Sequence, residues 1–97
     1  NGGVHDAFNL TDKLTRVWNG EDDALLDRYA RQRHHAASSD IQKTSDANHK
    51  RHREKDTTKR MAALKEMQDI IADEARAYKF MRESSLMDSL ERANAIE

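Results

Sequence analysis

The chain has 97 residues, of which 36% are apolar and 36% charged, with a formal net charge of −1 and no cysteine. Globular domains average about 45–50% apolar and about 25% charged residues, so this chain can bury only a thin core within a single domain. The lack of cysteine excludes disulfides, and the net charge argues against a general nucleic-acid binder. No apolar run reaches the ~18 residues that a membrane span needs. We therefore expect a soluble, cytoplasmic protein.

The first predicted element is a helix over about residues 4–18. Apolar residues recur in it at intervals of three and four, which places them on one face. These residues are Ala7, Leu10, Leu14 and Val17. Phe8 and Trp18 flank that face, and we expect them to dock on a sheet rather than to stack on a ligand. Gly20 follows a helix-ending asparagine and predicts the end of the helix.

A long polar helix is predicted over residues 21–56. Glu21, Asp22 and Asp23 supply the acidic residues that favour a first helical turn. From about residue 38 to 56 nearly all side chains are polar, so this stretch is either a solvated continuation of the helix or a mobile connection. The chain has no proline, and no glycine after Gly20, which favours the helix.

Residues 57–97 are predicted to form the C-terminal helices. Asp56 and the two threonines after it suit the start of a helix, whose apolar stripe consists of Met61, Leu64, Met67, Ile71, Ala75 and Tyr78. Ser84 and Ser85 with Asp88 match a capping box for a last helix. The sequence therefore predicts an all-α chain of three to four helices in an elongated arrangement.

The opening residues resemble one family. The matching pieces are Asn1-Gly2-Gly3, Asp6-Ala7, Asn9-Leu10 and Lys13-Leu14. In this order they are similar to the end of the flavin-binding domain of FAD-dependent aromatic-ring monooxygenases, the p-hydroxybenzoate hydroxylase-like class A flavoproteins. The family's preceding Gly-x-Gly is not in the sequence, so we expect the chain to be a fragment of a larger α/β FAD-binding enzyme.

Later segments carry the same resemblance. Gly20, the Leu25-Leu26 pair and Tyr29 match the family's connection into a long helix, and Arg31-Gln32-Arg33 matches the arginine segment after it. The family's usual proline is His34 here, which suggests a straighter helix. Residues 82–90 are similar to the terminal segment of one bacterial branch. The resemblance thus covers most of the chain.

The resemblance implies a cofactor contact at the start of the chain. It places the backbone of Asn1, Gly2 and Gly3 against the pyrimidine edge of the flavin ring of FAD. Reduced flavin carries negative charge at this edge, which backbone donors and a helix N-terminus stabilise, and glycine permits close approach. His5 and Asp6 lie in the same region and are expected to tune its electrostatics. The resemblance assigns no catalytic residue to this chain.

The resemblance also implies the parent activity, an NAD(P)H- and O₂-dependent hydroxylation of an aromatic ring. Residues 1–97 would be the C-terminal helical portion of the FAD-binding domain, divided into a flavin-edge turn and helix (1–20), the polar helix (21–56) and the C-terminal helices (57–97). We expect it to be inactive alone. Its expected partners are the rest of the flavin-binding domain, the aromatic substrate of the parent and a second copy of itself.

Two other functions are compatible with the composition. A non-enzymatic helical interaction or oligomerisation module would use the apolar stripes to bind a partner. A metal or nucleic-acid binder would use the histidines at 34, 35, 49 and 52 or the basic run over 50–60. Cations surround His49 and His52, and acidic residues interrupt the basic run, so we expect solvated surfaces, no metal site and no nucleic-acid partner.

Overall fold

The computed structural model describes residues 2–97, and every regular element within them is a helix. The elements are α1 (Gly2–Trp18), α2 (Ala24–His35), the π-helix η1 (Ala36–Ile41), α3 (Gln42–Arg53), α4 (Thr57–Ala72), α5 (Glu74–Ser84) and α6 (Met87–Asn94). The molecule measures 59 × 28 × 18 Å with a radius of gyration of 17.7 Å, against about 13 Å for a compact domain of this length. The predicted all-α, elongated arrangement is confirmed.

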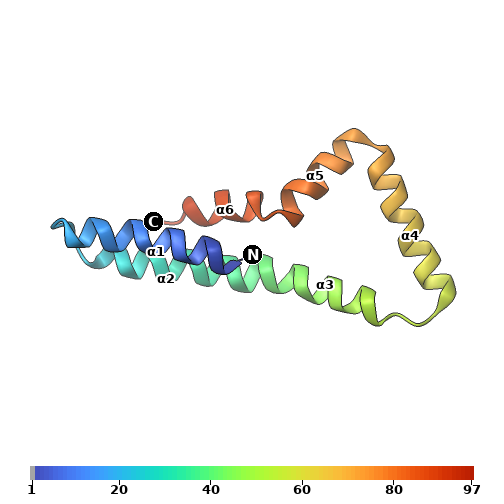
Figure 1. Cartoon of the computed structure of the whole chain (residues 1–97), viewed down its shortest axis with the longest axis horizontal. Coiled ribbons are helices and arrows are strands. Elements are labelled where there is room, and N and C mark those ends of the chain that lie inside the picture. Colours follow the sequence, from blue (N-terminus) through green and yellow to red (C-terminus); the bar gives the residue numbers. More distant parts are fainter. Residues whose placement is uncertain (1) are drawn as a thin grey trace.

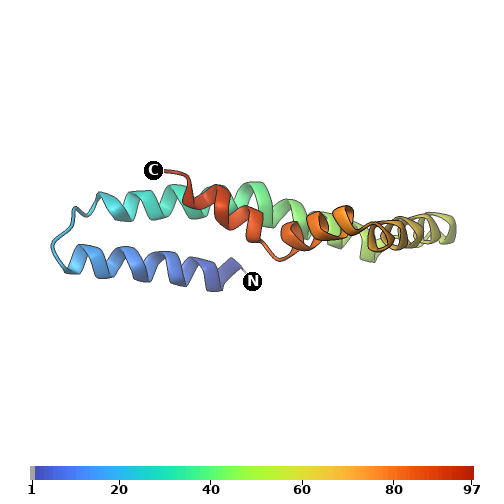
Figure 2. The same ribbon diagram turned by 90° about the horizontal axis from the view of Figure 1, so that it is seen from above.

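Helices α1 and α2 form an antiparallel hairpin, with the two rods side by side in Figure 2. The predicted stop after α1 is confirmed. The amide of Gly20 donates to the carbonyl of Val17, the amide of Glu21 donates to Arg16, and Gly20 has φ +102. This is the Schellman ending, which needs a left-handed residue and therefore favours glycine. It turns the chain so that α2 returns along α1.

Helices α2, η1 and α3 run without a break from Ala24 to Arg53. The polar stretch is therefore helical up to Arg53, and a mobile connection over that part is wrong. Within η1 the amide of Gln42 donates to the carbonyl of Ala37, five residues back. One such widened turn rotates the residues after it around the helix axis. It places Asp40 opposite α6 and Ile41 under the start of α1.

The predicted single helix from residue 57 through Tyr78 is wrong, because the chain breaks at Asp73. Asp73 has φ −105 and ψ 113, and its carboxylate accepts a hydrogen bond from the amide of Arg76 at 3.2 Å. Asp56 caps α4 in the same way through the amide of Lys59, as predicted. An aspartate that finds a free amide three residues ahead starts a new helix. Residues 2–97 accordingly form five separate rods rather than three to four.

The capping box predicted for the last helix is also wrong. The hydroxyls of Ser84 and Ser85 donate backwards to carbonyls of the preceding helix, at 2.8 and 3.3 Å. The carboxylate of Asp88 instead forms an ion pair with the guanidinium of Arg82, at 2.6 Å. Leu86 precedes α6 instead, in the left-handed conformation with φ 64, and it is buried. Burial of its side chain compensates the cost of that backbone conformation, about 1–2 kcal/mol.

The apolar core is as thin as the composition predicts. Among residues 2–97 the buried apolar side chains are Ala36, Leu86 and Ala93, at the crossing of η1 and α6. In Figure 1, α6 runs back over the long helix, while α4 and α5 form a bent arm away from the α1–α2 hairpin. Large apolar side chains remain exposed along the whole molecule, including Phe8, Trp18, Met61, Ile71, Tyr78 and Met81.

Candidate functional site

The predicted flavin-edge residues fall at the start of α1. Asn1 lies outside the described residues, while Gly2 and Gly3 belong to the helix itself. A Cβ atom on Gly2 would stand 2.5 Å from Cδ1 of Ile41, so Gly2 allows α1 to approach the long helix. Gly3 is exposed. Of the two described glycines, Gly3 is the one with an open surface for a ligand.

The chemistry of this helix start suits a negatively charged group. The first turn of α1 contains no acidic side chain, so nothing on it competes for the amide groups at the positive end of the helix dipole. Asp6 lies further along and points its carboxylate at Arg33, with 2.5 Å between Oδ1 and Nε. Since Arg33 is buried and positively charged, Asp6 adds little negative potential to the helix start. The residues present therefore fit the edge of a reduced flavin.

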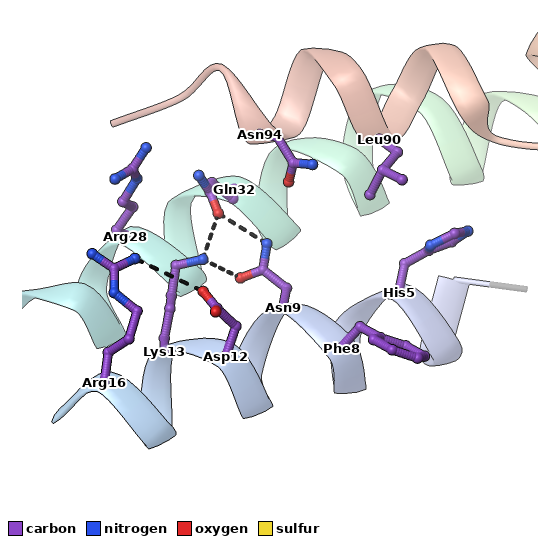
Figure 3. A pocket seen from close by; sticks show the side chains of 10 residues that line it. All are labelled: His5, Phe8, Asn9, Asp12, Lys13, Arg16, Arg28, Gln32, Leu90 and Asn94. Carbon is purple, nitrogen blue, oxygen red and sulfur yellow. Dashed lines mark hydrogen bonds and ion pairs between the residues drawn. The ribbon is translucent and has the colours of Figure 1, made fainter. Parts of the chain in front are cut away.

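A groove of about 460 Å³ opens between α1, α2 and α6, and Figure 3 shows the side chains that line it. One of the residues that line it is Lys13, which is only 5% exposed. The Lys13 ammonium donates to Asn9 Oδ1 at 2.5 Å and to Gln32 Oε1 at 2.9 Å, and the Asn9 amide donates to the same Gln32 oxygen. Burial, reinforced by the charge of Arg28, lowers the pKa of Lys13.

Polar residues of α2 hold the C-terminal segment over this groove. Gln32 donates to the carbonyl of Ile96 at 2.6 Å, Arg28 donates to that carbonyl at 3.2 Å, and Arg31 donates to the carbonyl of Glu97 at 3.0 Å. Sequence reasoning noted Arg31-Gln32-Arg33 only as part of a family pattern and missed these contacts. The i, i+4 spacing of Arg28 and Gln32 was the available signal, because it places both on one helix face.

A second polar junction joins α6 to the long helix. The Arg92 guanidinium donates to Asp40 Oδ1 at 2.6 Å, while Asp40 Oδ2 is buried without a partner. Burial opposes ionisation of Asp40, but the hydrogen bond and charge of Arg92 outweigh it and lower the pKa of the carboxyl. Nearby, Arg82 binds both Asp88 and Glu91 at 2.6 Å. Sequence reasoning had given Asp40 and Arg92 no role.

The residues weighed for metal or nucleic acid lie on exposed surfaces. His34, His35, His49 and His52 are all exposed. Within residues 2–97 no three side chains of the His, Cys, Asp or Glu type gather in a way that could hold a metal ion. The basic run lines an open groove of about 850 Å³ between α3 and α4, together with Glu54 and Glu66.

Comparison with known families gives one match. The family model described as FAD binding domain matches residues 1–44, which cover α1, α2, η1 and the start of α3. No curated protein and no solved structure matches the chain. The match supports an FAD-dependent, hydroxylase-like flavoprotein family with FAD as its cofactor. None of the helices over residues 2–97 has the length and apolar character needed to cross a membrane.

Proposed function

We propose that residues 1–44 form the flavin-edge segment of an FAD-dependent monooxygenase of the p-hydroxybenzoate hydroxylase-like class. The observation that carries this proposal is the match of the FAD-binding family model to residues 1–44. The first helix of this segment, α1, starts at Gly2. The parent enzyme would hydroxylate an aromatic ring, with NAD(P)H as reductant and O₂ as oxidant. It would act in the cytoplasm.

The contribution of this chain to the chemistry is binding and electrostatics. Bound FAD would supply the redox chemistry. The backbone at Asn1, Gly2 and Gly3 would approach the pyrimidine edge of the ring, where amide donors and the helix dipole stabilise negative charge. No side chain of this chain is proposed as catalytic. Every described element is a helix, so a strand–loop–helix unit for the FAD phosphates would have to come from another segment.

Exposed apolar side chains on α1 support a docking role toward the rest of the flavin-binding domain. Phe8 is 76% exposed and Trp18 is 90% exposed. Rings this large seldom stay in water unless a partner surface covers them. We propose that α1 packs on the sheet of the flavin domain through these two rings.

A second function, a helical oligomerisation module, is supported by a different region. Helix α4 packs on α5, α5 also packs on α6, and the two helices of the arm expose Met61, Leu64, Ile71, Tyr78 and Met81. Self-association through this arm would bury them. Sedimentation velocity tests it: a concentration-dependent dimer that Ile71→Glu dissociates supports the module, and a monomer at all concentrations contradicts it.

The proposed flavin role is tested by grafting residues 1–97 onto a flavoprotein hydroxylase from which the corresponding segment has been removed. We expect the graft to purify with close to one FAD per chain and to hydroxylate the host's substrate. In the graft, Gly3→Ala adds a methyl group at the flavin edge and should weaken FAD binding about tenfold. Gly20→Ala, which is remote from that edge, is the matched control and should keep FAD.

Two results would contradict the proposal. The first is a graft that carries no flavin although it is folded. The second is FAD affinity that Gly3→Ala leaves unchanged. The 97-residue chain by itself should neither hold FAD stoichiometrically nor oxidise NADH. A yellow, active complex of this chain alone would show that the missing phosphate-binding unit is not required.

A further inference from the structure

The most unusual group in the molecule is the buried ammonium of Lys13. It is 5% exposed, yet both of its hydrogen-bond partners, Asn9 and Gln32, are neutral amide oxygens. An ammonium has three N–H donors, so one remains after these two bonds. Buried charges in proteins are normally paired with an opposite charge. Two amide dipoles solvate the Lys13 ammonium, but no carboxylate is bonded to it.

The groove around Lys13 has an excess of positive charge. Arg28 and Arg16 line it together with Lys13, and Asp12 is the acidic residue among its lining side chains. Asp12 lies 3.8 Å from Arg16, whose guanidinium also donates to both carboxylate oxygens of Glu21. Arg16 is thus neutralised by its own neighbours. Lys13 and Arg28 are the two cations left with no carboxylate bonded to them.

These two cations line the same groove from two helices. Figure 3 shows the Lys13 ammonium of α1 beside Asn9 and Gln32, and the Arg28 side chain extending from α2 toward the C-terminal segment. Arg28 uses Nε to bond the Ile96 carbonyl, so its two terminal nitrogens remain for another acceptor. The volume of about 460 Å³ lies in the usual range for small-molecule sites.

We propose that this groove binds a small oxyanion, a carboxylate or phosphate group, at the Lys13 ammonium, with Arg28 as the second cation that lines the groove. The anion supplies the countercharge that the buried ammonium lacks. Charge-assisted hydrogen bonds to such groups are stronger than neutral ones, and the partly water-excluded groove strengthens them further. The site lies on the α1–α2–α6 faces and does not depend on flavin at the start of α1.

The test is isothermal titration calorimetry of the 97-residue chain at constant ionic strength, with sodium chloride as the balancing salt. Inorganic phosphate and acetate are titrated separately, which distinguishes the two sources of the oxyanion. We expect saturable binding of at least one of them. Lys13→Met should weaken it about tenfold, the effect of losing one charge-assisted hydrogen bond.

Two further variants test whether the anion binds in this groove. Lys65→Met is the matched control, because Lys65 is an exposed lysine of α4 far from the groove. It should leave binding unchanged. Arg28→Gln removes the second cation while its amide can still donate to Ile96, so it tests the site even if Lys13→Met fails to fold. Lys13→Met is expected to fold, since the Asn9–Gln32 bond at 2.9 Å does not involve Lys13.

Saturable binding that Lys13→Met and Arg28→Gln weaken, and Lys65→Met does not, supports the site. Phosphate alone or acetate alone would then identify the group it takes. The absence of saturation with either anion overturns the proposal. Equal affinity in wild type and both groove variants overturns it too, because the anion would then bind elsewhere.

Discussion

The α1–α2 hairpin and the α4–α5 arm are built from similar amounts of helix but are held in different ways. In the hairpin, buried polar residues cross between helices: Lys13, Gln32 and Arg33 reach partners on the facing helix. In the arm, ion pairs such as Lys65–Asp69 stay within one helix and are exposed, and the large apolar residues face solvent. The exception is Arg82 of α5, which bonds Asp88 and Glu91 of α6. Buried polar residues therefore hold the two helices of the hairpin together, whereas in the arm such contacts join only the last turn of α5 to α6.

The same division appears in the family match. Residues 1–44 match the FAD-binding family model, and the arm lies outside that match. Regions that interact with a cofactor domain need a defined geometry, which hydrogen-bond networks provide. The family match thus falls on the region that buried polar contacts hold together, and the proposed flavin role concerns this region.

The largest expected effect comes from breaking the hairpin network. Gln32→Ala removes the oxygen that accepts hydrogen bonds from Lys13 and Asn9, and the amide that donates to the Ile96 carbonyl. It should lower the free energy of unfolding by about 3 kcal/mol. Met61→Ala on the arm, at a residue 60% exposed, should cost no more than about 0.5 kcal/mol. Urea unfolding followed by circular dichroism measures both. Equal losses would mean that the arm is covered in solution.

A pair of glycines gives the next largest effect, with opposite signs. Gly20 has φ +102 and open space around it, so Gly20→Ala should cost about 1–2 kcal/mol through backbone strain alone. Gly3 is exposed and helical, so Gly3→Ala should stabilise the isolated chain by up to about 1 kcal/mol. Thermal unfolding checks the signs. A gain at Gly20 would contradict the Schellman ending of α1.

Within the arm, the cap at Asp73 should act locally. Asp73→Ala removes the acceptor of the Arg76 amide and should cost about 1 kcal/mol. Hydrogen exchange should speed up at Arg76 and its neighbours and stay unchanged in α1. Asp56→Ala is the matched variant, because Asp56 caps α4 through Lys59. Faster exchange throughout the molecule would show that the arm and hairpin unfold together.

The smallest effect concerns pH and the junction between Asp40 and Arg92. The folded pKa of Asp40 lies below the ordinary value of 3.8, so the unfolded chain binds more protons between the two values. The stability from this pair is present above pH 3.8 and is lost as the pH falls through the folded pKa. Arg92→Gln should reduce this acid-induced loss. An identical acid profile in wild type and Arg92→Gln would contradict it.

Helix positions could be predicted where local chemistry decides them. Gly20 ended α1 and Asp56 began α4 as expected, because caps depend on neighbours in sequence. Asp73 and Leu86 were missed for a tertiary reason. A cap inside an apolar stripe competes with helix continuation. The left-handed conformation of Leu86 accompanies burial of its side chain, which depends on the tertiary fold.

The candidate sites were predictable only in part. Gly2 and Gly3, two of the three residues predicted at the flavin edge, lie at a helix start, and their contact with flavin stays a prediction. The burial of Lys13 could not be predicted, since the apolar face of α1 contains Ala7 and Leu14, which are exposed. The buried face is instead polar, and its partners come from residues 19 or more positions away. Periodicity of apolar residues does not detect such a face.

The FAD content of two grafts tests the central claim most directly. One graft carries residues 1–44 alone and the other the whole chain, each on a flavoprotein hydroxylase that lacks its own segment. If the hairpin and the first turns of the following helix form the flavin-edge unit, both grafts should purify with the same FAD-to-protein ratio, close to one. A full ratio with the whole chain and an empty graft with residues 1–44 would contradict the account, because residues 45–97 would then be needed to hold the cofactor.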